Sequence, residues 1–126
     1  MKRKYFLLCL LLLGCLAQPA SAAGGDYNPG YRSMVAWLPG NRVRVDVAVW
    51  YPTARNPSRL TVGSWTFEGA RNAAPSQGLW PLIILSHDSC GSRFAHHDLA
   101  SSLARQGYIV AAPTHDGDNA DDMRYL

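Results

Sequence analysis

Polar and apolar residues alternate most regularly between residues 42 and 51, in the stretch R-V-R-V-D-V-A-V-W-Y. This period of two, together with the β-branched valines, is typical of a strand with one buried face. A Pro-Gly-Asn turn signal at residues 39–41 comes before it, and residues 31–38 also favour a strand. We therefore expect two antiparallel strands joined by a short turn.

Residues 59–67 favour one further short strand, and the Gly, Ala, Asn, Pro and Ser residues between positions 69 and 78 indicate a loop. The pattern changes at residues 82–85, where L-I-I-L is a continuous apolar run. Such a run is expected of a strand that is covered on both faces in a largely parallel sheet.

A helix is predicted over residues 93–106, where the apolar side chains suit one helical face and Gly107 follows as a natural end. Residues 108–112 form a second apolar run. Strand, helix and strand in this order predict a right-handed βαβ unit. The fold class is therefore α/β, with antiparallel first strands followed by a parallel βαβ unit.

The first 22 residues contain the three parts of an export signal. Cations at residues 2–4 are followed by an apolar run at 5–13 and by A-S-A at 20–22. We expect cleavage after Ala22 and a periplasmic or secreted protein. The run is shorter than the roughly 20 apolar residues that a membrane span needs, so we expect no transmembrane anchor. The alternative is a lipoprotein, because L-L-G-C at residues 12–15 is similar to a lipidation signal at Cys15.

The charge of the chain lies in this N-terminal segment. The whole sequence has 12 basic and 9 acidic residues, but three of the basic ones belong to the expected signal. Residues 23–126 are then formally neutral, which argues against a nucleic-acid partner, since such an interface needs clustered cations. Cys9 and Cys15 would leave with the signal, so Cys90 would have no partner for an intramolecular disulfide.

Three motifs occur in a fixed order: R-V-D-V-A-V-W-Y-P-T at residues 44–53, L-S-H-D-S-C-G at 85–91 and G-Y-I-V-A-A-P-T-H at 107–115. The stretch from residue 81 to 119 resembles the N-terminal half of an α/β-hydrolase. It is most similar to the dienelactone hydrolases and the bacterial relatives of platelet-activating-factor acetylhydrolase. The resemblance implies an exported hydrolase that attacks carboxylic ester or lactone carbonyls through an acyl-enzyme, with no cofactor and no metal.

The resemblance also assigns a role to the loop after residue 85. In these hydrolases that loop supplies one backbone N–H of the oxyanion hole, which by position is the N–H of Ser89. His87, Asp88, Cys90 and Gly91 form the surrounding structural loop, and Asp88 and Cys90 stand where family members have glycine. If either glycine position requires a positive φ, the side chain strains the loop.

The resemblance places the rest of the catalytic machinery elsewhere. The nucleophile of an α/β-hydrolase lies on a G-x-S-x-G type elbow, and the acid and histidine follow it. No such elbow occurs in this sequence. We therefore expect residues 23–126 to be a partial hydrolase domain, truncated before the elbow and inactive. The alternatives are a noncatalytic exported or lipid-anchored binding protein, or an unstable chain whose last strand is an exposed apolar edge.

Four local groups of residues suggest other chemistry. Ser86, His87 and Asp88 include the three triad types, but neighbours on an extended chain point to opposite faces and cannot form a relay. Cys90 beside His87 is an alternative nucleophile. The spacing of the histidines does not favour a metal; they are His87, His96, His97 and His115. An acidic cluster could bind Ca²⁺, but its spacing favours a solvated loop; it contains Asp116, Asp118, Asp121 and Asp122.

Overall fold

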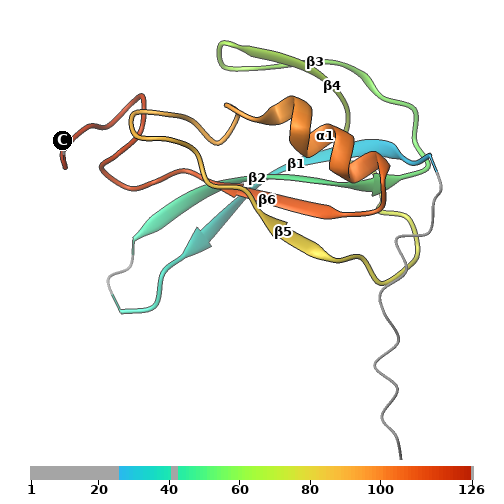
Figure 1. Cartoon of the computed structure of the whole chain (residues 1–126), viewed down its shortest axis with the longest axis horizontal. Helices are drawn as coiled ribbons and strands as arrows, with labels where there is room; N and C mark the ends of the chain where they lie inside the picture. Colours follow the sequence, from blue (N-terminus) through green and yellow to red (C-terminus); the bar gives the residue numbers. More distant parts are fainter. Residues whose placement is uncertain (1–25, 41–42, 126) are drawn as a thin grey trace, which may run out of the picture.

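The computed structural model describes residues 26–40 and 43–125, so the predicted export signal and lipidation site lie outside the described residues. The described residues form a six-stranded sheet of order β3-β4-β1-β2-β6-β5 and one α-helix (Figure 1). The elements in chain order are β1 (Asn28–Trp37), β2 (Arg44–Thr53), β3 (Ser58–Val62), β4 (Trp65–Arg71), β5 (Leu82–Ile84), α1 (His97–Arg105) and β6 (Ile109–Pro113).

The predicted antiparallel pair is confirmed as β1 and β2, which are hydrogen-bonded over their full length with Tyr31 opposite Trp50. The alternating pattern of β2 buries Ala48 and Trp50 completely, on the face that also carries Tyr31. These strands form the centre of the sheet, between β4 and β6.

The prediction of one strand over residues 59–67 is wrong. The chain turns at Gly63, whose φ is +59°, so that Val62 lies opposite Trp65 and two strands form a hairpin. Glycine adopts this left-handed backbone without the cost that a side chain brings, and so it permits a tight two-residue turn. β4 then continues to Arg71, inside the segment predicted as a loop.

The predicted order of strand, helix and strand and the parallel pairing of the two strands are confirmed. β5 and β6 are parallel neighbours, with Ile83 opposite Val110. α1 begins at His97, four residues later than predicted, because residues 93–96 form turns. The helix ends as predicted, since Gly107 follows Gln106 with φ +93° and adopts the left-handed conformation typical of helix C-termini.

The burial predicted for residues 82–85 is wrong, because Leu82 and Ile84 are 61% and 62% exposed. α1 covers one face of the sheet (Figure 1). Ile83 packs against the core on that face, so the alternation of side chains along a strand places Leu82 and Ile84 on the other face. The expected exposed last strand is also wrong: β6 lies between β2 and β5, and β5 is the edge. Met34 of β1 is 50% exposed, so apolar side chains extend across this face.

The core lies between α1 and the covered face of the sheet. Its centre is a cluster of buried aromatic rings, with Tyr31 and Phe67 5.1 Å apart between centroids and Trp50 and Phe94 6.4 Å apart. The small side chains of Ala100 and Ala104 allow the helix to approach this layer closely, since both are fully buried. The core thus fixes the helix over the sheet and, with it, the loop that joins β5 to α1.

Candidate active site

The loops that follow β5 and β6 lie side by side, because these strands are parallel neighbours and their carboxyl ends lie at the same end of the sheet. Ser86 Oγ lies 2.9 Å from His115 Nε2, and the rings of His87 and His115 stack with centroids 3.8 Å apart. Residues separated by 28 or 29 positions in the sequence thus meet directly after the two strands.

His87 has a structural role in this arrangement. It is buried, its Nδ1 lies 2.8 Å from the carbonyl oxygen of Asp88, and its Nε2 accepts the backbone N–H of His115 at 3.1 Å. Since Nε2 accepts, Nδ1 carries the proton and donates it to the Asp88 carbonyl. Both ring nitrogens are therefore occupied by backbone groups. The imidazole joins the two loops, and no Ser86-His87-Asp88 relay forms.

Asp118, in the segment after β6, also holds the predicted oxyanion loop. Its Oδ1 accepts the hydroxyl of Ser89 at 2.8 Å and the backbone N–H of Cys90 at 2.9 Å. The Cys90 amide, followed by the Ser89 hydroxyl, lowers the pKa of the Asp118 carboxyl, because both donors stabilise its charged form. Within the loop, Gly91 N donates to the Asp88 carbonyl at 2.9 Å.

The two positions where this sequence lacks the family's glycines differ in backbone conformation. Cys90 has φ +58°, whereas Asp88 does not have a positive φ. The expected strain therefore applies to Cys90 and not to Asp88. The retained Gly91 has no room for a side chain, since an added Cβ would lie 2.7 Å from the Asp88 carbonyl oxygen and 3.0 Å from His87 Nδ1.

The backbone N–H of Ser89 differs from those of the two residues that follow it. The Cys90 amide is bound by Asp118 and the Gly91 amide by Asp88, but no acceptor among residues 26–40 and 43–125 binds the Ser89 amide. Ser89 is exposed at the edge of the sheet. The predicted oxyanion donor is thus free, on a loop that its neighbours hold in place.

The acidic cluster, His97 and Cys90 show no arrangement typical of a metal site or of a second catalytic site among the described residues. Arg124 contacts two members of the acidic cluster, Asp116 and Asp122, each at 2.8 Å. His97 stacks on Phe67 with ring centroids 5.5 Å apart, and Cys90 is an exposed free thiol. No group of three or more metal-ligating side chains gathers in the part of the chain that the structure describes.

Comparison with known proteins identifies the family. The family described as platelet-activating factor acetylhydrolase, isoform II, matches residues 32–126. The chain belongs to this family. Its membership confirms the predicted relationship to the α/β-hydrolases. A search of curated protein sequences finds no match.

The fold of this acetylhydrolase-family chain is similar to a solved esterase structure. A ferulic acid esterase from Streptomyces cinnamoneus superimposes with a TM-score of 0.63 at 22% sequence identity. The match covers 79% of the present chain and 37% of the esterase, so the chain spans about a third of that protein. The predicted α/β fold class is confirmed.

Sequence reasoning missed how the loop after β5 is held. It treated Asp118 as a member of a solvated acidic cluster and His115 as one of four histidines whose spacing does not favour a metal, whereas both bind the loop after β5. The available signal was topological. Polar residues that directly follow two adjacent parallel strands meet at one edge of the sheet, and His115 and Asp118 follow β6 within five residues.

Proposed function

We propose that this chain supplies the oxyanion-hole half of an exported hydrolase that cleaves carboxylic ester or lactone bonds. The observation that carries the proposal is the free backbone N–H of Ser89, on a loop fixed by His87, His115 and Asp118. A rigid donor next to the carboxyl ends of parallel strands suits an oxyanion that develops during acyl transfer.

The family and the structural likeness support this substrate class. Acetylhydrolase and ferulic acid esterase are both names for enzymes that cleave carboxylic esters. The proposal extends to lactones, because attack on a lactone carbonyl also produces a tetrahedral oxyanion. The dienelactone hydrolase resemblance of the loop motif favours this extension.

The proposal assigns the nucleophile, acid and catalytic histidine to residues outside this sequence. The two local candidates do not replace them: His87 has both nitrogens bound to backbone groups, and the exposed Cys90 thiol therefore has no base at His87. The 126-residue chain by itself is then inactive toward esters.

Export is a separate part of the proposal, and it rests on the pattern of residues 1–22. Across residues 26–40 and 43–125, no helix is long and apolar enough to cross a membrane. Mass spectrometry of the exported protein tests the route: a new N-terminus at Ala23 supports signal cleavage, and a lipid on Cys15 supports the lipoprotein alternative.

The catalytic role is tested by joining the chain to the elbow-containing remainder of a hydrolase of this family and measuring kcat with p-nitrophenyl butyrate. Ser89→Pro removes the proposed N–H donor and should lower kcat about 10²- to 10³-fold, as the loss of one oxyanion donor does. Ser89→Ala keeps the amide and loses only the hydroxyl, so it serves as the matched control. Equal kcat values for the two variants would refute the role of Ser89.

A further inference from the structure

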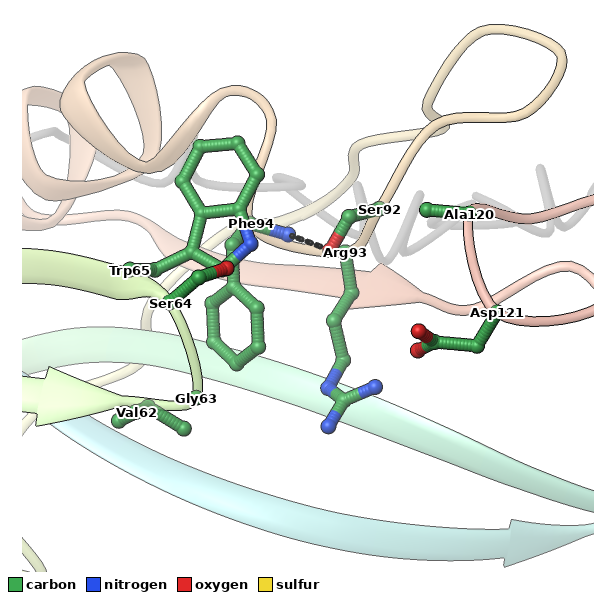
Figure 2. Close-up of a pocket in the computed structure, with 9 residues that line it drawn as sticks. All are labelled: Val62, Gly63, Ser64, Trp65, Ser92, Arg93, Phe94, Ala120 and Asp121. Carbon is green, nitrogen blue, oxygen red and sulfur yellow. Dashed lines mark hydrogen bonds between the residues drawn. The ribbon is translucent and has the colours of Figure 1, made fainter.

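A pocket beside the oxyanion loop contains Arg93, a cation that forms no ion pair within residues 26–40 and 43–125. The pocket has a volume of about 320 Å³ and lies between the β3–β4 turn, the start of the turns before α1 and the segment after β6 (Figure 2). We call it the Arg93 pocket; its lining includes Ser64, Trp65, Ser92, Arg93, Phe94 and Asp121.

The guanidinium of Arg93 is held in a defined position. Its Nη1 donates to Thr114 Oγ1 at 2.9 Å, and its central carbon lies 4.8 Å from the centroid of the Phe94 ring. Its Nε is buried and has no hydrogen-bond partner among the described residues. Nη1 has a second N–H and no described residue binds Nη2, so the edge formed by Nη1 and Nη2 is left for a ligand, whereas the buried Nε is enclosed by the protein.

The charges around the pocket leave Arg93 uncompensated. No carboxylate of the described residues lies within ion-pair distance of Arg93, whereas Arg124 neutralises Asp116 and Asp122. Asp121 lines the pocket at an exposed position and is not paired with Arg93. A partly buried cation without a partner is unfavourable, so an anion in the pocket would compensate it.

A second donor is available on the wall of the pocket. Ser92 Oγ accepts the backbone N–H of Phe94 at 3.2 Å, as Figure 2 shows, and its hydroxyl hydrogen remains able to donate. A carboxylate or phosphate has two oxygens spaced to match one side of a guanidinium, and a planar fork binds such groups with two hydrogen bonds.

We propose that the Arg93 pocket binds the anionic group of a small organic molecule, either a carboxylate or a phosphate. Ser92 adjoins the loop that carries Ser89, and Ala120 N donates to the Gly91 carbonyl at 2.9 Å, so the pocket lies next to the proposed oxyanion donor. The ligand is then an ester that carries a negative charge remote from its reacting carbonyl. This identification of the ligand as substrate rests on the proposed function, but anion binding itself does not.

The test is an NMR titration of the full 126-residue chain that follows the indole N–H of Trp65, assigned with Trp65→Phe. Sodium phosphate and sodium acetate are added separately, with sodium chloride adjusted to keep the ionic strength constant, and methyl acetate serves as the neutral probe. We expect a saturable shift with at least one of the two anions and none with methyl acetate. Saturation by only one anion assigns the group to that class.

Four variants locate the site. Arg93→Gln should weaken anion binding at least about tenfold. The affinity of Arg93→Lys should lie between those of Arg93→Gln and the unaltered chain, since a lysine keeps the charge and loses the planar fork. Asp121→Asn should tighten binding, because it removes a negative charge from the lining. Arg55→Gln removes an equal charge at an exposed residue outside the pocket and should leave binding unchanged.

The outcomes separate the two proposals. Absence of a saturable shift in the unaltered chain overturns the anion site, and so does equal binding by Arg93→Gln whose Trp50 indole signal shows an intact fold. Anion binding together with an inactive completed hydrolase overturns the substrate assignment and leaves the site. Hydrolysis of neutral esters by the completed chain, without anion binding here, leaves the proposed function and removes this inference.

Discussion

Replacing Cys90 by glycine should stabilise the chain, although the change removes a side chain. Cys90 has φ +58°, and a left-handed backbone costs a non-glycine residue about 1–2 kcal/mol. The freedom that glycine adds to the unfolded chain offsets about 0.4–1 kcal/mol of the gain. The thiol is exposed, so little burial is lost, and the backbone N–H that binds Asp118 is kept. The net gain is about 0.5–1 kcal/mol, and the melting temperature should rise by about 2–8 °C.

Thermal unfolding followed by circular dichroism measures this gain, with two matched variants beside it. Asn72→Gly changes the other non-glycine residue of positive φ among the described residues and should gain less, because asparagine tolerates this conformation. Ser89 does not have a positive φ, so glycine relieves no strain there, and the substitution removes the hydroxyl that binds Asp118. Ser89→Gly should therefore lower the melting temperature. A lower melting temperature for Cys90→Gly would refute the assignment of strain to this loop.

Three further predictions concern the loop and the core. Gly91→Ala should lower the free energy of unfolding in urea by about 1–3 kcal/mol, because the added methyl group overlaps the Asp88 carbonyl; an unchanged midpoint would contradict this. The Cys90 amide lowers the pKa of the Asp118 carboxyl from its usual value. The contribution of Asp118 to stability is therefore present above the unfolded pKa and is lost as the pH falls through the lower folded pKa. Melting temperatures measured between pH 6 and 2 should therefore fall less steeply for Asp118→Asn than for the unaltered chain. Phe67→Ala should cost about 3–5 kcal/mol in the same urea assay, whereas the exposed Glu68→Ala should stay within about 0.5 kcal/mol.

The sequence predicted those elements whose signal is local. Alternation identified β2, the apolar runs identified β5 and β6, and Gly107 marked the end of α1. The hairpin at Gly63 was missed because a short apolar segment with a glycine reads equally well as one strand.

The exposure of β5 could not be predicted from its residues. Leu82 and Ile84 have the composition of a strand covered on both faces, but α1 covers only one face of the described sheet. An apolar run shows that a strand is suited to burial. It does not show whether another element covers the strand. The uncovered apolar face agrees with a chain that spans about a third of the similar esterase.

The candidate site was predicted only in part, because its contacts join distant segments. Resemblance located the loop around Ser89, but the groups that hold it, His115 and Asp118, are 28 or 29 residues away. Arg93, which forms no ion pair within the described part of the chain, was missed for the same reason. Its isolation depends on the turn between β3 and β4 and on the segment after β6, which meet only in the folded chain.

Ester hydrolysis by the purified 126-residue chain tests the central claim most directly. The claim is that the chain carries an oxyanion donor and no nucleophile of its own. With p-nitrophenyl butyrate, we expect no burst and no saturable turnover above the buffer rate. Saturable turnover that disappears in Cys90→Ala or Ser86→Ala, but not in Ser33→Ala, would contradict the account by showing a working nucleophile within these residues.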